Sequence, residues 1–214
     1  MSDNFALNEN EQIIVEPSTK PLRIYIARQI STLLSPMVIS LPLIVLVAHY
    51  HTSNMLTTSI YAGLVFFFLS IGPMAYILIG VHLGKFTDVD VSQRTQRIGP
   101  FLFGLISAMA GLFMLVLTRG PKSLETLLVI TIVSGAVMMI TTFWWKISIH
   151  ASSLAGAVTI LVILYGTLVL PAFLLLLPLG WSRVVLRRHT VAQVITGSIV
   201  SIILSSMVFA IRGV

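Results

Sequence analysis

Long apolar stretches alternate with short polar junctions along most of this chain. A stretch of about 18 or more apolar residues is long enough to cross the hydrocarbon core of a membrane as an α-helix. The pattern predicts spanning helices at residues 33–50, 57–82, 101–118, 124–145 and 191–211, with a kink at Gly72-Pro73. Before the first span, residues 21–29 alternate basic and apolar positions, which predicts a helix lying at the membrane interface.

The apolar stretch from residue 151 to residue 181 is too long for one crossing. As a single helix its 31 residues would extend about 46 Å, whereas the hydrocarbon core is about 30 Å thick. Gly166 and Pro171 divide the stretch, so we predict two helices, at 149–166 and 170–187, joined by a tight turn. The chain would then cross the membrane seven times.

Seven crossings place three polar junctions on one membrane face, together with the N-terminus. These junctions are residues 85–97, 146–153 and 182–193. If residues 151–181 crossed only once, His189 would lie on the opposite face from His150. The hairpin is therefore a prediction that the structure tests.

Composition fixes the class of protein. Of the 214 residues, 57% are hydrophobic and 9% are charged, more apolar surface than a water-soluble core can bury. We predict an all-α, polytopic transmembrane bundle of about six or seven spanning helices, with a polar tail at 1–20 and one domain at 21–214. The acidic, polar start has no basic n-region, so no cleaved signal peptide is expected. The chain has no cysteine, which excludes disulfides and thiolate chemistry.

The formal net charge of +6 is carried by cations at the predicted helix ends. This placement favours membrane lipids and a phosphorylated lipid substrate as partners, and not nucleic acid. Of the 13 lysines and arginines, Arg119, Lys122 and Arg212 fall on the face opposite the three polar junctions. Because cytoplasmic loops carry the excess of basic residues, the face with the junctions is expected to be cytoplasmic.

The most concentrated group of charges lies in residues 180–193, GWSRVVLRRHTVAQ. Charge alone is typical of a basic flank that anchors helices and sets topology. The spacing adds a second interpretation, because Ser182-Arg183, His189 and Gln193 form the pattern SRxxxxxHxxxQ. This pattern resembles the third signature of the type 2 phosphatidic acid phosphatase family, SRxxxxxHxxxD, with glutamine in place of the final aspartate.

Two earlier segments are similar to the other family signatures, in the same order. Ser148 and His150 in KISIH match the serine and histidine of PSGH, while isoleucines replace its proline and glycine. The first signature, KxxxxxxRP, corresponds only loosely to the loop that contains Lys85, Arg94, Arg97 and Pro100. The resemblance extends from about residue 85 to the C-terminus and implies a core of the phosphatidic acid phosphatase and haloperoxidase type.

The resemblance implies a lipid phosphate phosphatase that needs no metal and no cofactor. His189 would attack phosphorus as a neutral imidazole and form a phosphohistidine, which water then cleaves. His150 would protonate the leaving oxygen and later deprotonate the water. Arg183 would stabilise the transition state, and the further phosphate-binding residues would be Lys85, Arg94, Arg97, Ser148 and Ser182.

Gln193 departs from the family at the residue that supports the nucleophile. An amide can accept a hydrogen bond from the imidazole but brings no negative charge, and no acidic residue follows Glu125. If a carboxylate supports His189, it must therefore be Asp88 or Asp90 from the first polar loop.

Three alternatives remain open from the sequence. A family member could bind phosphorylated lipids without turning them over, which the altered signatures favour. A haem-binding or other cofactor-binding bundle could use the histidines at helix ends, which are His49, His51, His82, His150 and His189. A polyprenyl transferase could use Asp88 and Asp90, but it needs more aspartates to hold magnesium diphosphate than the chain offers.

Overall fold

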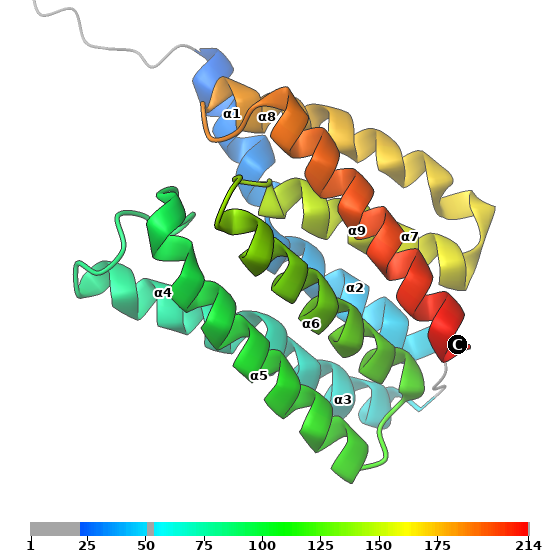
Figure 1. The fold of residues 1–214 in the computed structure, drawn as a ribbon. Coiled ribbons are helices and arrows are strands. Elements are labelled where there is room, and N and C mark those ends of the chain that lie inside the picture. The colour runs from blue at the N-terminus through cyan, green and yellow to red at the C-terminus, as the bar shows by residue number, and fades with distance from the viewer. Residues whose placement is uncertain (1–21, 51–53, 214) are drawn as a thin grey trace, which may run out of the picture.

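The computed structural model describes residues 22–50 and 54–213, and within these ranges every element of regular secondary structure is a helix (Figure 1). The predicted tail at 1–20 and His51 lie outside the described residues. Within the described ranges, six helical segments are long and apolar enough to cross a membrane: Leu22–Tyr50, Met55–His82, Arg94–Leu117, Lys122–Thr142, Thr167–Val185 and Val191–Arg212. The helix α7 (Ile149–Tyr165) is also apolar but has 17 residues. The protein is thus a polytopic helical membrane protein.

The N-terminal helix makes a tertiary contact that its sequence pattern does not predict. Helix α1 (Leu22–Leu33) packs against α8 (Leu176–Val185) and leads, after a short break, into α2 (Pro36–Tyr50). Ala27 and Ser31 of α1 are buried, so this helix packs against the bundle and is continuous with the first long apolar segment, Leu22–Tyr50. The tertiary contact with α8 decides its position, and the amphipathic pattern alone does not reveal such a contact.

The second span contains the predicted irregularity at Gly72-Pro73. Helix α3 (Met55–Phe66) passes through a π-helical turn, η1 (Phe67–Ile71), into α4 (Gly72–His82). Proline has no backbone N–H, so a carbonyl in the preceding turn loses its helical partner. The Ser107 hydroxyl from α5 (Ile98–Leu117) donates to the Phe68 carbonyl at 2.6 Å and satisfies it.

The predicted hairpin is confirmed, and it positions the polar segments that follow. Helix α7 ends at Gly166, whose φ of +83° and ψ of −169° suit glycine, and the chain reverses there. It returns through the 3₁₀ segment η3 (Thr167–Leu175) and α8, and Leu154 of α7 packs close to Leu179 of α8. At standard helical rises α7 extends about 26 Å, and η3 with α8 about 33 Å.

The remaining helices complete the bundle in Figure 1. Helix α6 (Lys122–Thr142) packs between α5 and α9 (Val191–Arg212), and α7 lies along α9. The backbones of α7 and α9 approach closely at Gly156, where an added Cβ would lie 2.6 Å from the Ser201 hydroxyl. This close packing fixes the start of α9, and therefore His189, relative to the start of α7.

Candidate functional site

The three polar junctions meet at one end of the bundle. The Arg97 guanidinium donates to the carbonyl of Ile147 at 3.3 Å, which joins the first junction to the second. The Lys146 ammonium donates to the carbonyl of Arg188 at 2.9 Å, which joins the second to the third. The predicted convergence of these segments on one face is therefore confirmed.

His189 lies in the short connection between α8 and α9. The connection starts with a left-handed residue, Arg187, at the end of α8, and it ends at Thr190, the N-cap of α9. The hydroxyl of Thr190 accepts from the backbone N–H of Gln193, and the Gln193 side chain accepts from the backbone N–H of Thr190. This reciprocal capping box fixes the first turn of α9.

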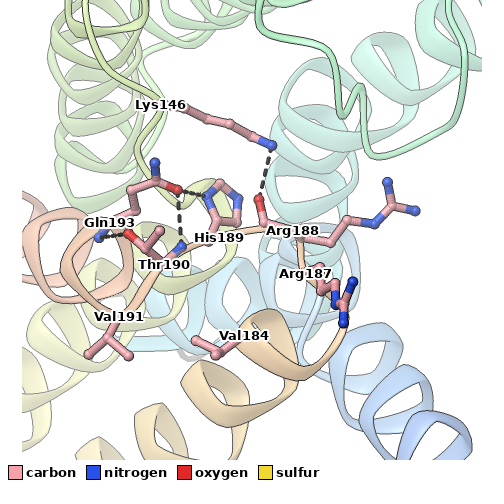
Figure 2. A pocket seen from close by; sticks show the side chains of 8 residues that line it. All are labelled: Lys146, Val184, Arg187, Arg188, His189, Thr190, Val191 and Gln193. Atoms are coloured by element: carbon pink, nitrogen blue, oxygen red, sulfur yellow. Dashed lines mark hydrogen bonds between the residues drawn. The ribbon is translucent and has the colours of Figure 1, made fainter.

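The same capping box determines how Gln193 faces His189. Oε1 of Gln193 lies 3.2 Å from the Thr190 backbone nitrogen and 3.1 Å from Nδ1 of His189 (Figure 2). A backbone N–H can only donate, so Gln193 must present its oxygen to both groups. Nδ1 therefore carries the proton and donates to Gln193, while Nε2 keeps its lone pair. This is the tautomer that nucleophilic attack through Nε2 requires.

A pocket of about 620 Å³ opens beside His189. Figure 2 shows the residues that line it, which are Lys146, Val184, Arg187, Arg188, His189, Thr190, Val191 and Gln193. Cationic and polar groups thus lie next to two valines at the end of the membrane-spanning helices. The lining suits a ligand with an anionic group and an apolar part.

Arg183 is the largest fully buried side chain of the described residues, with 2% of its surface exposed. Both of its terminal nitrogens donate to Oδ2 of Asp90 at 3.2 Å, and one also donates to the hydroxyl of Ser31 at 2.6 Å. Its Nε is buried and has no partner among the described residues. The predicted phosphate-binding arginine is therefore held in place from two other elements, with one donor unused.

The first-junction cations have different surroundings. Arg97 is buried and donates to the carbonyls of Val91 and Ile147, so it holds two loops together. Arg94 donates to the carbonyl of Trp144 at 3.0 Å. Lys85 is exposed, does not line the pocket, and makes no side-chain hydrogen bond or ion pair with any described residue. The structure thus ties Arg97 to the second junction and Arg94 to Trp144 just before it, but does not bring Lys85 into contact with the site.

The two predicted serines have structural hydrogen bonds. Ser148 is the N-cap of α7 and accepts from the backbone N–H of Ala151, while its own N–H donates to the Gln193 carbonyl at 3.2 Å. Ser182 donates to the Leu179 carbonyl at 2.7 Å. Both side chains are fully buried and already have partners, so their present role is to position the helices.

His150 lies in the first turn of α7 and is partly buried. It interacts electrostatically with Arg183, Asp90 and Arg97, and His189 interacts with Arg183 and Arg97 as well. His150 does not line the pocket beside His189. The two histidines therefore share the cationic neighbours Arg183 and Arg97 at one end of the bundle, although only His189 lines the pocket.

The structure differs from the expectation that Asp88 or Asp90 supports His189. Asp90 accepts from Arg183, and Asp88 accepts from the backbone and hydroxyl of Ser92 and lies 3.7 Å from Arg188. Arginines on the opposing segment attract both carboxylates. Nδ1 of His189 instead has the neutral amide of Gln193 as its partner.

Burial and the cationic surroundings together control the protonation of the site. Burial, together with the positive charges of Lys146, Arg97 and Arg183, lowers the pKa of His189 to about 3, so its imidazole is neutral at physiological pH. Burial and the neighbouring Arg97, Arg183 and Arg188 also lower the pKa of Lys146. For Asp88, burial alone would raise the pKa, but hydrogen bonds from Ser92 and the charge of Arg188 lower it. An anionic ligand would relieve the repulsion among these cations.

Sequence reasoning missed six of the eight residues that line the pocket, of which four are polar or charged and two are valines. Lys146 lies four positions before His150, a spacing that places residues on one helical face, yet it directs its ammonium to Arg188. From the sequence alone, Arg187 and Arg188 are typical of a basic flank that anchors a helix at the membrane surface. Thr190 precedes Gln193 by three residues, and this capping-box spacing was the available signal for the orientation of Gln193.

Comparison with known proteins found no matching family model, no matching curated protein and no matching solved structure. Any functional conclusion therefore rests on the motifs and on the geometry of the site.

Proposed function

We propose that this chain is a divergent member of the type 2 phosphatidic acid phosphatase family, with its core fold, that hydrolyses the phosphate ester of a membrane lipid without a metal. The observation that carries the proposal is the arrangement of His189 in the pocket. Nδ1 donates to Gln193, which leaves Nε2 unprotonated among cations. A neutral, oriented imidazole in a cationic pocket is what attack on phosphorus requires.

The proposed reaction has two displacement steps. The Nε2 lone pair of His189 forms a bond to phosphorus while the ester P–O bond breaks, and the leaving oxygen takes a proton from His150. Water then attacks the phosphohistidine, gives a proton to His150, and returns the N–P electron pair to Nε2. The ester and one water thus yield an alcohol and phosphate. Arg183, Lys146 and Arg97 would neutralise the phosphoryl oxygens.

The membrane location of the pocket supports a lipid substrate. The pocket lies where α8 ends and α9 begins, and Val184 and Val191 line it beside the cations. A phosphorylated lipid would place its head group on the cations while its chain stays with the apolar helices. A water-soluble phosphate ester would gain nothing from the valines.

A phosphatase assay with a chelator tests the proposal. Purified protein with EDTA is expected to release phosphate from phosphatidic acid or from a polyprenyl diphosphate, and His189→Ala is expected to abolish the release. His49→Ala is a matched control, since His49 lies in the last turn of α2. Release that survives His189→Ala would show that the nucleophile is elsewhere.

A binding protein without turnover is the second candidate, and two observations favour it. Gln193 brings no negative charge to stabilise an imidazolium, and Asp90 already neutralises Arg183. This candidate predicts that anionic lipid binds at the site while no phosphate is released in the same assay.

We further propose that the site faces the cytoplasm, on the basis of the basic residues at this end of the bundle. Because the chain has no cysteine, single cysteines report topology without background. Lys122→Cys is expected to react with an impermeant maleimide on intact cells, whereas Val89→Cys, at a site that is 44% exposed, is expected to be protected. The reverse pattern would place the site outside.

A further inference from the structure

Arg187 occupies a backbone position that ordinarily belongs to glycine. Helix α8 ends with paired hydrogen bonds, from the N–H of Arg187 to the Val184 carbonyl at 2.9 Å and from the N–H of Arg188 to the Arg183 carbonyl at 3.0 Å. In this helix ending the residue at Arg187 is left-handed, and its φ is +53°. An L-residue is strained in this conformation. The chain therefore places a cation where the backbone alone favours glycine.

The side chain of Arg187 is also free, unlike the other cations around His189. Lys146 donates to the Arg188 carbonyl, Arg183 to Asp90, and Arg188 to Ser92. Arg187 is exposed and makes no side-chain hydrogen bond or ion pair within residues 22–50 and 54–213. Among the described cations that line the pocket, it is the one with its donors fully available to a ligand.

The position of Arg187 suggests which part of a ligand it would bind. Figure 2 shows its guanidinium well away from the imidazole of His189, on the side of Val184. A phosphoryl group under attack by Nε2 must lie next to the imidazole. An anionic group at Arg187 would therefore be a second group on the same molecule.

The net charge of the cluster agrees with two anionic groups. Among the described residues, the five cations Lys146, Arg97, Arg183, Arg187 and Arg188 lie around the two carboxylates Asp88 and Asp90, so these seven side chains carry a net charge of +3. A phosphate monoester carries at most two negative charges, whereas a diphosphate ester carries up to three. The cluster is thus matched in charge to a diphosphate.

We infer that Arg187 is a specificity residue that selects lipid diphosphates over lipid monophosphates; this rests on the proposed function. Nε2 of His189 bonds to the terminal phosphorus as the bridging P–O bond breaks. The electron pair remains on the bridging oxygen, which leaves on the lipid monophosphate, and Arg187 neutralises its charge. Water then cleaves the phosphohistidine, so that lipid diphosphate and water give lipid monophosphate and phosphate.

Kinetics on a matched pair of substrates test this role. For a polyprenyl diphosphate, Arg187→Gly is expected to lower kcat/KM by about tenfold to a hundredfold, the value of a charge-assisted hydrogen bond. For the corresponding monophosphate, kcat/KM should remain within about twofold, because this substrate has no second phosphoryl group for Arg187 to bind. Arg187→Lys keeps the charge and the strained backbone, and should retain most of the preference.

Arg119 provides a matched control at the other end of the bundle. It is also exposed, it has a φ of +53°, and it follows α5. Both glycine variants should be no less thermally stable than the wild type, because glycine accepts this backbone conformation. Arg119→Gly should leave the substrate preference unchanged. Equal losses on both substrates for Arg187→Gly would overturn the specificity role while leaving the phosphatase proposal in place.

A binding measurement keeps the inference testable if the chain does not turn lipids over. Wild-type protein should bind inorganic pyrophosphate more tightly than orthophosphate in calorimetry, and Arg187→Gly should lose that preference. Absence of turnover with this binding pattern would reject the phosphatase reaction and retain Arg187 as a diphosphate-binding residue. Equal affinity of the wild type for both anions would overturn the inference.

Discussion

Oδ2 of Asp90 accepts hydrogen bonds from both terminal nitrogens of Arg183, each at 3.2 Å. The arginine is 2% exposed and the carboxylate 33%, so the pair lies between the first polar loop and the interior of α8. The same guanidinium donates to Ser31 of α1. One buried cation thus joins three segments that are far apart in the sequence, and a bound phosphate would have to share or replace Asp90.

Replacing Asp90 tests this relationship. Asp90→Asn leaves a buried guanidinium without its counter-ion, so we expect a loss of about 2–3 kcal/mol in the free energy of unfolding. Orthophosphate should restore part of this loss, because the freed Arg183 can bind it. The measurement is thermal unfolding in detergent with and without phosphate. An equal effect of phosphate on variant and wild type would show that Arg183 does not meet the anion.

The Gln193 amide should be essential as an acceptor and replaceable by a carboxylate. Gln193→Leu removes the partner that fixes the His189 tautomer, and kcat/KM should fall by about a hundredfold to ten-thousandfold. Gln193→Glu keeps the acceptor and adds a negative charge, which should raise the pKa of His189 by about 1–3 units. The acid limb of the pH profile should then move upward by a similar amount. An unchanged profile in the glutamate variant would mean that His189 does not set that limb.

Acid should destabilise the protein through His189. Its pKa is about 3 in the folded protein and 6.5 in the unfolded chain, so between these values the unfolded chain binds a proton that the folded protein does not. Stability therefore falls as the pH drops from about 6.5 to about 3, by up to about 1.4 kcal/mol per pH unit. Unfolding as a function of pH should show a shallower dependence for His189→Gln. The same slope in both proteins would contradict the buried neutral imidazole.

The hairpin turn should depend on Gly166. Its backbone conformation is nearly exclusive to glycine, and a Cβ there meets no other atom within 4 Å, so Gly166→Ala adds backbone strain alone. We expect a loss of about 1–3 kcal/mol in unfolding free energy. Gly63→Ala is the control, since Gly63 lies within α3 with open space around it and alanine should stabilise that helix by about 0.5–1 kcal/mol. Equal unfolding free energies for the two variants would show that the turn does not depend on the glycine-specific conformation of Gly166.

The local pattern predicted much of the fold because a membrane sets the lengths of its spanning helices. The stretch from 151 to 181 exceeds one crossing, which required a reversal near Gly166, and the structure confirms it. That reversal in turn placed the junctions around Lys146 and His189 at the same end of the bundle, where Lys146 contacts the Arg188 carbonyl. The packing of α1 against α8 was not predicted, because the amphipathic pattern alone does not reveal a tertiary contact.

The sequence by itself determined the class of protein, the hairpin and the histidines that carry the motif, because apolar length and residue spacing are local properties. Only the tertiary structure decided which charges meet. Asp90 pairs with Arg183, which is 93 positions away, and not with His189, because helix packing brings the first loop against α8. Likewise, only the tertiary structure shows that the Arg187 side chain is free, because it shows that Lys146, Arg183 and Arg188 each have a hydrogen-bond partner.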